Sequence, residues 1–122
     1  MPIRVQGLDH VALAVGDQRA SEAWYRDVLG LEREYSAEWG DTPVALMAHG
    51  SGLALFRASG DGEPAVGLRH VAFRVDRENF DLAVEDLRAR GIAIEIQDHG
   101  VSRSVFFLDP DGLRLELTTY EV

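Results

Sequence analysis

The sequence predicts an α+β fold made of two βαβββ modules in a single domain. The phrase L-x-H-V-A-x-x-V occurs twice, as LDHVALAV from Leu8 and LRHVAFRV from Leu68, 60 residues apart in a chain of 122. Both copies are rich in β-branched residues with alternating character, which is typical of strands. A helix pattern and then three short strand patterns follow each copy, so the repeat extends beyond the phrase itself.

The first module is expected over residues 7–58. After its opening strand, Asp17 can cap a helix and Gly30 can end it. The apolar stripe expected on this helix consists of Ala20, Ala23, Trp24 and Val28. The three strands expected next lie near Glu32–Trp39, Pro43–Ala48 and Leu53–Ala58.

The second module is expected over residues 68–120, after a linker at 59–67 with the sequence SGDGEPAVG. Asp76 can cap its helix and Gly91 can end it. The apolar stripe consists of Phe80, Ala83, Val84 and Leu87. The three strands expected next lie near Ile92–Asp98, Arg103–Leu108 and Leu113–Thr119, with the turn sequence DPDG at 109–112 before the last strand.

Composition and charge exclude several classes of function. The net charge of −9 argues against nucleic-acid binding, and no apolar run approaches the ~20 residues that cross a bilayer. The N-terminus lacks the apolar segment of a signal peptide. Without cysteine or lysine, disulfides, thiolate nucleophiles and Schiff bases are also excluded. We expect a cytoplasmic protein that binds a small-molecule substrate and does not bind nucleic acid or membranes.

Three strands carry residues suited to a metal on one face. Because side chains alternate along a strand, His10 lies opposite the apolar face of the first strand and His70 opposite that of the fifth. Glu116 lies opposite the leucines of the last strand. Two imidazoles and one carboxylate can hold a divalent transition metal with open coordination positions. We therefore predict His10, His70 and Glu116 as metal ligands, with water or substrate completing the coordination.

The repeat also predicts how many ligands the protein supplies. A symmetric site would have a fourth ligand 60 residues before Glu116, where the chain has Phe56. Phenylalanine cannot bind a metal, so the predicted site has three protein ligands.

Further residues are candidates for contact with a substrate. Arg74 and Arg114 could orient an anionic substrate, or they could form salt bridges. His99 could act as an acid or base, or it could be a surface loop residue. Apolar residues that could line a pocket, but that could equally belong to the core, are Trp39, Met47, Phe56 and Phe106.

The paired modules, the histidine in the first strand of each, and FFLDPDGLRLEL at 106–117 resemble the vicinal oxygen chelate superfamily. The resemblance implies a glyoxalase-like fold, in which curved mixed sheets surround a metal-binding cleft. The metal would act as a Lewis acid on two vicinal oxygens of a substrate, and His10, His70 and Glu116 match the ligand positions. The resemblance also implies a homodimer with sites at or near the interface, so His10 could serve a different metal from His70 and Glu116 of its own chain.

Departures from the family's patterns separate its members. Glyoxalase I usually has a glutamate, and methylmalonyl-CoA epimerase a glutamine, as a fourth ligand in the fourth strand; residues 53–56, LALF, offer neither. Fosfomycin-resistance proteins typically have a threonine two residues after the first histidine and a tyrosine in the seventh strand. This chain has Ala12 and Phe106 there.

Ring-cleaving dioxygenases use two histidines and a glutamate for ferrous iron, and part of their motif is present. The matching residues are His99, Asp109, Pro110, Gly112 and Glu116, whereas Gln97 and Phe106 depart from it. We expect a metal-dependent small-molecule enzyme, with ring cleavage ranked first. The alternatives are a glyoxalase-type lyase or isomerase and a metal-free binding protein of the bleomycin-resistance type. One divalent metal per site is expected, and iron, manganese, zinc, nickel and cobalt all accept this ligand set.

Overall fold

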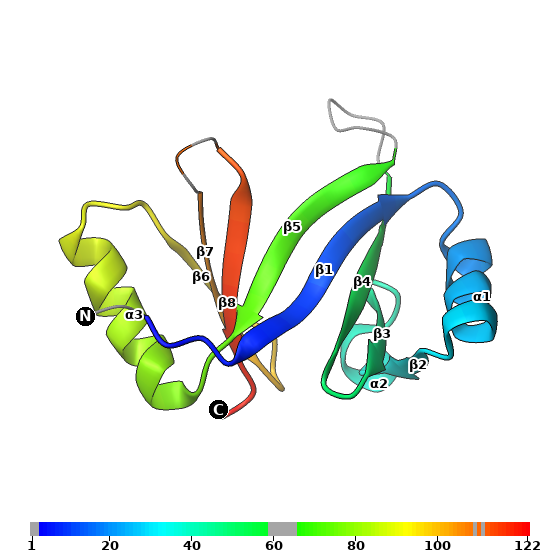
Figure 1. Cartoon of the computed structure of the whole chain (residues 1–122), viewed down its shortest axis with the longest axis horizontal. Helices are drawn as coiled ribbons and strands as arrows, with labels where there is room; N and C mark the ends of the chain where they lie inside the picture. Colours follow the sequence, from blue (N-terminus) through cyan, green and yellow to red (C-terminus); the bar gives the residue numbers. More distant parts are fainter. Residues whose placement is uncertain (1–2, 59–65, 109, 111) are drawn as a thin grey trace. The chain divides into compact units, whose positions relative to one another are not determined.

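The computed structural model describes residues 3–58, 66–108, 110 and 112–122, and within them it contains three helices and eight strands (Figure 1). These are β1 (Gly7–Val15), α1 (Gln18–Leu29), β2 (Glu32–Glu34), α2 (Ser36–Trp39), β3 (Val44–Ala48), β4 (Ser51–Arg57), β5 (Gly67–Arg74), α3 (Arg77–Ala89), β6 (Glu95–Asp98), β7 (Arg103–Leu108) and β8 (Arg114–Thr119). The predicted βαβββ order occurs twice, with α2 as an addition, and the α+β class is confirmed.

The chain divides into two compact units, which are described separately. The N-terminal unit is His10–Arg69, and the C-terminal unit combines Met1–Asp9 with His70–Val122. Strand β1 therefore starts in the C-terminal unit and continues into the N-terminal one. Residues 59–65 of the predicted linker, and residues 109 and 111 of the predicted turn, lie outside the described residues, and Gly67 already belongs to β5.

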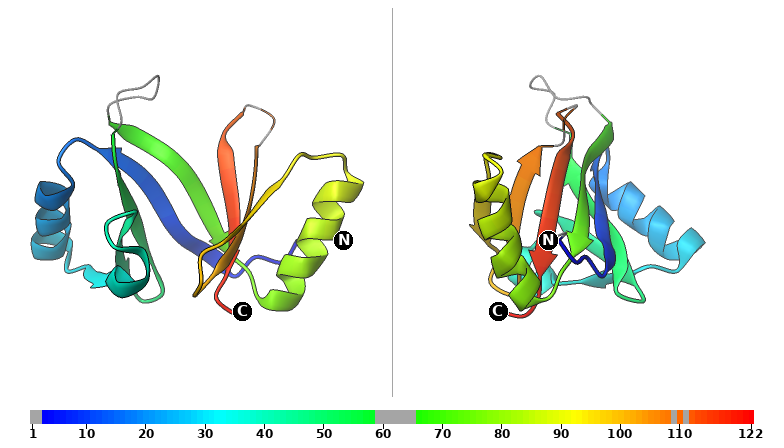
Figure 2. Two further views of the ribbon diagram at one scale, coloured as in Figure 1. Left: turned by 180° about the vertical axis from the view of Figure 1, so that it is seen from behind. Right: turned by 60° about the vertical axis from the view of Figure 1, so that its left-hand side comes forward.

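The C-terminal unit is a mixed sheet in the order β5-β8-β7-β6, with β5 and β8 parallel and the other pairs antiparallel. Helix α3 covers one face of this sheet (Figure 2). Asp76 caps α3 by accepting a hydrogen bond from the Asn79 backbone N–H at 2.8 Å. The predicted stripe is confirmed as the core contact, which consists of Phe80, Ala83, Val84 and Leu87 from α3 with Val75, Val105 and Leu117 from the sheet side. The opposite face of the sheet is left for the polar residues of β5 and β8.

The N-terminal unit has the corresponding strand order, β2-β3-β4-β1, with β1 and β4 parallel. Asp17 caps α1 through the Ala20 backbone N–H at 3.0 Å, and Gly30 ends the helix in the left-handed conformation at φ +69°. Both predicted helix ends are thus confirmed. The core of this unit consists of Val15, Val44, Leu46 and Leu55, with Leu13 and Tyr25 packed against it.

The predicted apolar stripe of the first helix is wrong. All four of its residues are exposed, Trp24 to 52% and Val28 to 57%. The helix instead turns Tyr25 and Gln18 towards the sheet. The Gln18 side-chain amide donates hydrogen bonds to the backbone carbonyls of Asp41 and Leu55, at 2.8 and 2.9 Å. A buried polar anchor therefore determines which side of the helix faces the sheet.

The strand predicted at 32–39 is also wrong beyond its first three residues. Strand β2 stops at Glu34 because Tyr35 adopts the left-handed conformation, at φ +59°, which a strand cannot contain. Residues 36–39 then form the short helix α2, so Trp39 lies on a helix. The strand predicted to start at Ile92 starts instead at Glu95, and Ile92 and Ile94 pack against the core before it.

None of the helices among the described residues is long and apolar enough to span a membrane.

Candidate metal centre

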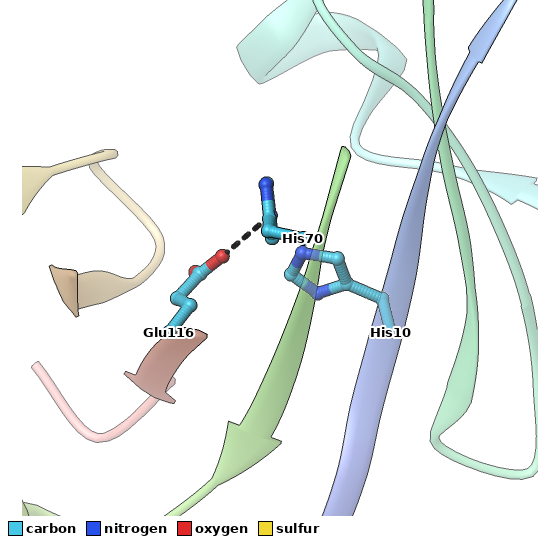
Figure 3. A group of neighbouring side chains, drawn as sticks. All are labelled: His10, His70 and Glu116. Atoms are coloured by element: carbon cyan, nitrogen blue, oxygen red, sulfur yellow. Dashed lines mark ion pairs between the residues drawn. The ribbon is translucent and has the colours of Figure 1, made fainter. Parts of the chain in front are cut away.

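His70 and Glu116 form a buried pair on neighbouring strands of the C-terminal unit. The parallel register of β5 and β8 places Ala72 beside Glu116, and His70 is two residues before Ala72 on the same face. Nε2 of His70 lies 2.9 Å from Oε1 of Glu116, and the two side chains are only 7% and 5% exposed. Figure 3 shows the imidazole and the carboxylate pointing towards one another. Strand pairing has therefore joined two residues that are far apart in the sequence.

Ser104 holds the second oxygen of the same carboxylate. Its Oγ donates a hydrogen bond of 2.6 Å to Oε2 of Glu116, and it also lies 3.3 Å from Oγ1 of Thr118. Ser104 is fully buried on β7, opposite Thr118 in the register. Metal-binding carboxylates commonly have such hydrogen-bonded support. Sequence reasoning missed Ser104, whose only signal is that it shares a face with Phe106 two residues later.

His10 is the third member of the group. It lies on β1 and is half-buried, immediately after Asp9. One potential ligand atom from each of His10, His70 and Glu116 lies within 4.8 Å of the others (Figure 3). Within the described residues, this is the one group of three or more such side chains that could hold a metal ion. The structure thus brings together the three ligands predicted from the sequence.

The donor set fits a divalent transition metal. Metal–ligand bonds of about 2.1 Å place two donors on the same ion roughly 3 Å apart. The distance of 2.9 Å between Nε2 of His70 and Oε1 of Glu116 is compatible with this separation, as it is with a direct hydrogen bond between the two side chains. Two nitrogens and one carboxylate oxygen leave coordination positions open for substrate oxygens.

Phe106 forms one wall beside this pair. It is the cross-strand partner of Glu116, it is 7% exposed, and its ring meets the His70 ring edge-on at 5.5 Å. The guanidinium of Arg114 lies over the ring of Phe106, 4.3 Å from the ring centroid. Phe106 and Arg114, two of the three residues of this unit predicted to contact substrate, therefore lie near the candidate ligands.

The predicted correspondence between Glu116 and Phe56 is wrong by two residues. Glu116 pairs with Ala72, whereas the repeat equivalent of Ala72, Ala12, pairs with Ala54. Ala54 thus occupies the place of Glu116 in the N-terminal unit. Alanine has no donor atom, so the expectation of three protein ligands is unchanged. Phe56 lies further along β4, under the guanidinium of Arg69 at 4.6 Å from the ring centroid.

Arg74 is held in an ion pair. Its guanidinium donates hydrogen bonds to Oδ1 of Asp9, and Tyr120 donates to Oδ2 of the same carboxylate at 3.0 Å. Asp9 is completely buried, and a buried carboxylate costs free energy unless it is paired and hydrogen-bonded, as it is here. The salt-bridge interpretation of Arg74 accounts for its position better than contact with a substrate does. Sequence reasoning missed Asp9 and Tyr120.

The other two apolar candidates lie in the N-terminal unit. Met47 is nearly buried on β3 and pairs with Gly52, which in turn pairs with His10, so all three share a face. Trp39 packs its ring against Tyr35, with 4.6 Å between the centroids. Met47 is therefore placed on the face of His10, whereas Trp39 has a local packing partner.

His99 does not belong to the ligand group. It directly follows Asp98, the last residue of β6. Asp98 pairs with Arg103 on β7, and Arg103 in turn pairs with Thr119 on β8. Two strand spacings and three residues along β8 place the Cα of Asp98 about 14 Å from that of Glu116, and His99 is one residue further. A catalytic base must come within about 3 Å of the proton that it transfers, directly or through one water molecule. A catalytic role for His99 therefore loses support.

Paired βαβββ units with a histidine–histidine–glutamate group define a glyoxalase-type fold with a candidate metal centre. Residues 7–117 match the Glyoxalase/Bleomycin resistance protein/Dioxygenase superfamily, and the chain belongs to this family. It is 34% identical to the uncharacterized protein YwkD of Bacillus subtilis over 93% of this chain and 96% of that protein. It is 31% identical to the glutathione transferase FosA of Serratia marcescens, over 93% of this chain and 80% of that protein. The crystal structure of methylmalonyl-CoA epimerase from Mycobacterium tuberculosis has the same fold, with a TM-score of 0.72 and 27% sequence identity. The match covers 94% of this chain and 88% of that chain.

Proposed function

We propose that this protein is a divalent-metal-dependent enzyme that acts on a small substrate with two neighbouring oxygens. The observation that carries the proposal is the grouping of His10, His70 and Glu116, with ligand atoms within 4.8 Å of one another. A metal bound there would act as a Lewis acid and polarise the substrate oxygens. A relative that is 26% identical over 96% of this chain, from Staphylococcus epidermidis, is named a metallothiol transferase, which supports this class of function.

The chain's own residues would hold and shield the metal. Ser104 keeps Oε2 of Glu116 occupied and leaves Oε1 directed at His70. Phe106 packs edge-on against the His70 ring, with 5.5 Å between the ring centroids, and so places an apolar surface on that side of the pair. A metal-free binding protein has no need of a buried carboxylate directed at a histidine, so the trio favours an enzyme over a sequestering protein.

For the reaction type, we place a redox-neutral transferase or isomerase reaction first. The ring-cleavage reaction ranked first in the sequence analysis needs the motif residues as well as the ligands. Phe106 has no hydroxyl to donate, and His99 lies far from Glu116 along the sheet. The near-full-length similarity to a glutathione transferase supports the new order. Ring cleavage remains the second candidate because two histidines and a carboxylate are also a ferrous-iron set.

The first experiment measures metal in protein purified without a histidine tag from metal-replete cells. We expect one equivalent of divalent metal per chain in the native protein. The His70→Ala variant should lose it, whereas the matched His99→Ala variant should retain it, because both remove a histidine of the same unit. Native protein that binds no metal would refute the proposed enzyme.

The second experiment compares reactions. The metal-loaded protein is given the methylglyoxal–glutathione adduct, an epoxide with glutathione, and, after anaerobic loading with ferrous iron, a panel of catechols. We expect turnover without oxygen consumption. Oxygen uptake with a catechol would reverse the order of the two candidates.

A further inference from the structure

Two arginines share the metal-ligand face of the C-terminal unit, in different surroundings. Arg74 is locked to the buried carboxylate of Asp9. Arg114 rests over the ring of Phe106, and its side chain is 43% exposed. Arg114 is thus the more exposed of the two, since the Arg74 side chain is 31% exposed, and its ion-pair partner is an exposed carboxylate rather than a buried one.

Arg114 is also close to the candidate metal centre. It lies two residues before Glu116 on β8, so the two side chains share a face. Phe106, beneath the guanidinium at 4.3 Å, meets the His70 ring at 5.5 Å, so the guanidinium is within about 10 Å of that ring. A small molecule chelated at the centre could reach it.

The present partner of Arg114 is easily exchanged. Nη2 of Arg114 lies 3.4 Å from Oε2 of Glu95, whose side chain is 61% exposed. Such long, exposed ion pairs contribute little free energy. The protein's net charge of −9 repels anions in general. An anionic substrate would therefore depend on a local positive charge near the site, such as the guanidinium of Arg114.

We propose that Arg114 is a specificity-determining residue that binds an oxyanion on the substrate. The substrate class is a molecule with a chelating pair of oxygens at one end and a carboxylate or a phosphorus oxyanion at the other. This inference rests on the proposed function, because the metal is what holds the chelating oxygens. Planar Arg–oxyanion pairs provide both geometry and affinity.

The test uses cobalt-loaded protein and two probes, catechol and protocatechuate, which is a catechol bearing a carboxylate. Binding is followed by the visible absorption of cobalt, so no turnover is needed. We expect the native protein to bind protocatechuate about tenfold more tightly than catechol. Arg114→Gln should remove this preference and leave catechol affinity unchanged within about twofold. Glu95→Gln should increase the preference, because it removes the competing carboxylate.

The control is Arg103→Gln, which removes the same charge from the opposite face of the sheet. Arg103 lies over Phe80 of α3, 5.6 Å from the ring centroid. Its substitution should therefore leave the preference for protocatechuate intact. A preference that survives Arg114→Gln, or that disappears equally in Arg103→Gln, overturns the inference. Failure of both probes to change the cobalt spectrum overturns the proposed function instead.

Discussion

Glu116 presents its two carboxylate oxygens to different partners. Oε1 is 2.9 Å from His70, and Oε2 accepts the 2.6 Å hydrogen bond from Ser104. The side chain is buried, so neither oxygen can rely on bulk water. The serine hydroxyl therefore determines which way the carboxylate faces before any ligand arrives.

Replacing Ser104 with alanine tests this division of roles. We expect cobalt affinity to fall about tenfold, as is common when the support of a ligand is removed. The free energy of unfolding of metal-free protein should fall by about 1–2 kcal/mol, because Oε2 loses its buried donor. Cobalt titration and urea denaturation measure the two effects.

Thr118→Val is the matched control. Thr118 contacts the Ser104 hydroxyl at 3.3 Å, and no hydrogen bond joins it to Glu116 among those described. The Thr118→Val variant should have a lower free energy of unfolding, and its cobalt affinity should stay within about twofold of the native value. Equal losses of affinity in both variants would mean that Ser104 supports the strand pair rather than the ligand.

The sequence was enough to select the three candidate ligands because strand alternation fixes which residues share a face. Ser104 could not be selected in the same way. A serine on a strand has no distinctive pattern, and its role depends on the register that places it opposite Thr118 and next to Glu116. The contacts of Asp9 could not be predicted for a similar reason, because Asp9 and Tyr120 are 111 positions apart in the sequence and are joined only by the fold.

At the scale of elements, one buried carboxylate ties the start of β1 to the end of β5 and to the segment after β8. Asp9 is fully buried and receives Arg74 and Tyr120. Because His10 directly follows Asp9, this cluster also positions a candidate ligand. A buried charge that loses its partner destabilises a protein strongly.

We expect Arg74→Gln to lower the free energy of unfolding by about 2–3 kcal/mol and Tyr120→Phe by about 1 kcal/mol. Urea denaturation measures both. The control is Arg90→Gln, which removes an exposed pair with Asp86 and should change stability by less than about 0.5 kcal/mol. Losses of similar size in Arg74→Gln and Arg90→Gln would show that the burial of Asp9 is unimportant.

Gly52 has no Cβ, and this allows β3 and β4 to approach one another closely. A Cβ at this position would lie 1.9 Å from the backbone oxygen of Leu46, which cannot move without opening the hairpin. We expect Gly52→Ala to destabilise the protein by more than about 2 kcal/mol. Gly16→Ala, at a position with open space around it, should be close to neutral. Thermal unfolding of the two variants distinguishes the effect of crowding the Leu46 backbone from the effect of replacing any glycine with alanine.

Element order and helix caps followed from local sequence, whereas helix rotation and strand register did not. The cap residues Asp17 and Asp76 act on neighbours three residues away, so a local pattern suffices. Helix α1 is rotated by the contacts of Gln18 with residues more than 20 positions away. The two-residue shift between Glu116 and Phe56 reflects a longer chain between the paired strands, since Ala12 pairs with a residue 42 positions later and Ala72 with one 44 positions later.

At the scale of the molecule, the repeat gives each unit the same strand order while placing the ligands unequally. His70, Glu116 and the supporting Ser104 all belong to the C-terminal unit, and His10 is the contribution of the N-terminal unit. The N-terminal counterpart of Glu116 is an alanine, so this unit cannot build a second site of its own. Among the described residues, the ligand-type carboxylate is therefore present at this place in one of the two units.

If the protein forms the homodimer expected from its family, the source of His10 becomes testable. Asp9 is bound by Arg74 and Tyr120 of its own chain, and His10 is the next residue, so we expect one chain to supply all three ligands. Co-expressed His10→Ala and Glu116→Ala chains, carrying different affinity tags, are purified as mixed dimers. Each chain then lacks one ligand, and cobalt analysis should find no intact site. Recovery of one metal per mixed dimer would show that His10 serves the partner's metal, because only exchange between chains could assemble a complete trio from these two variants.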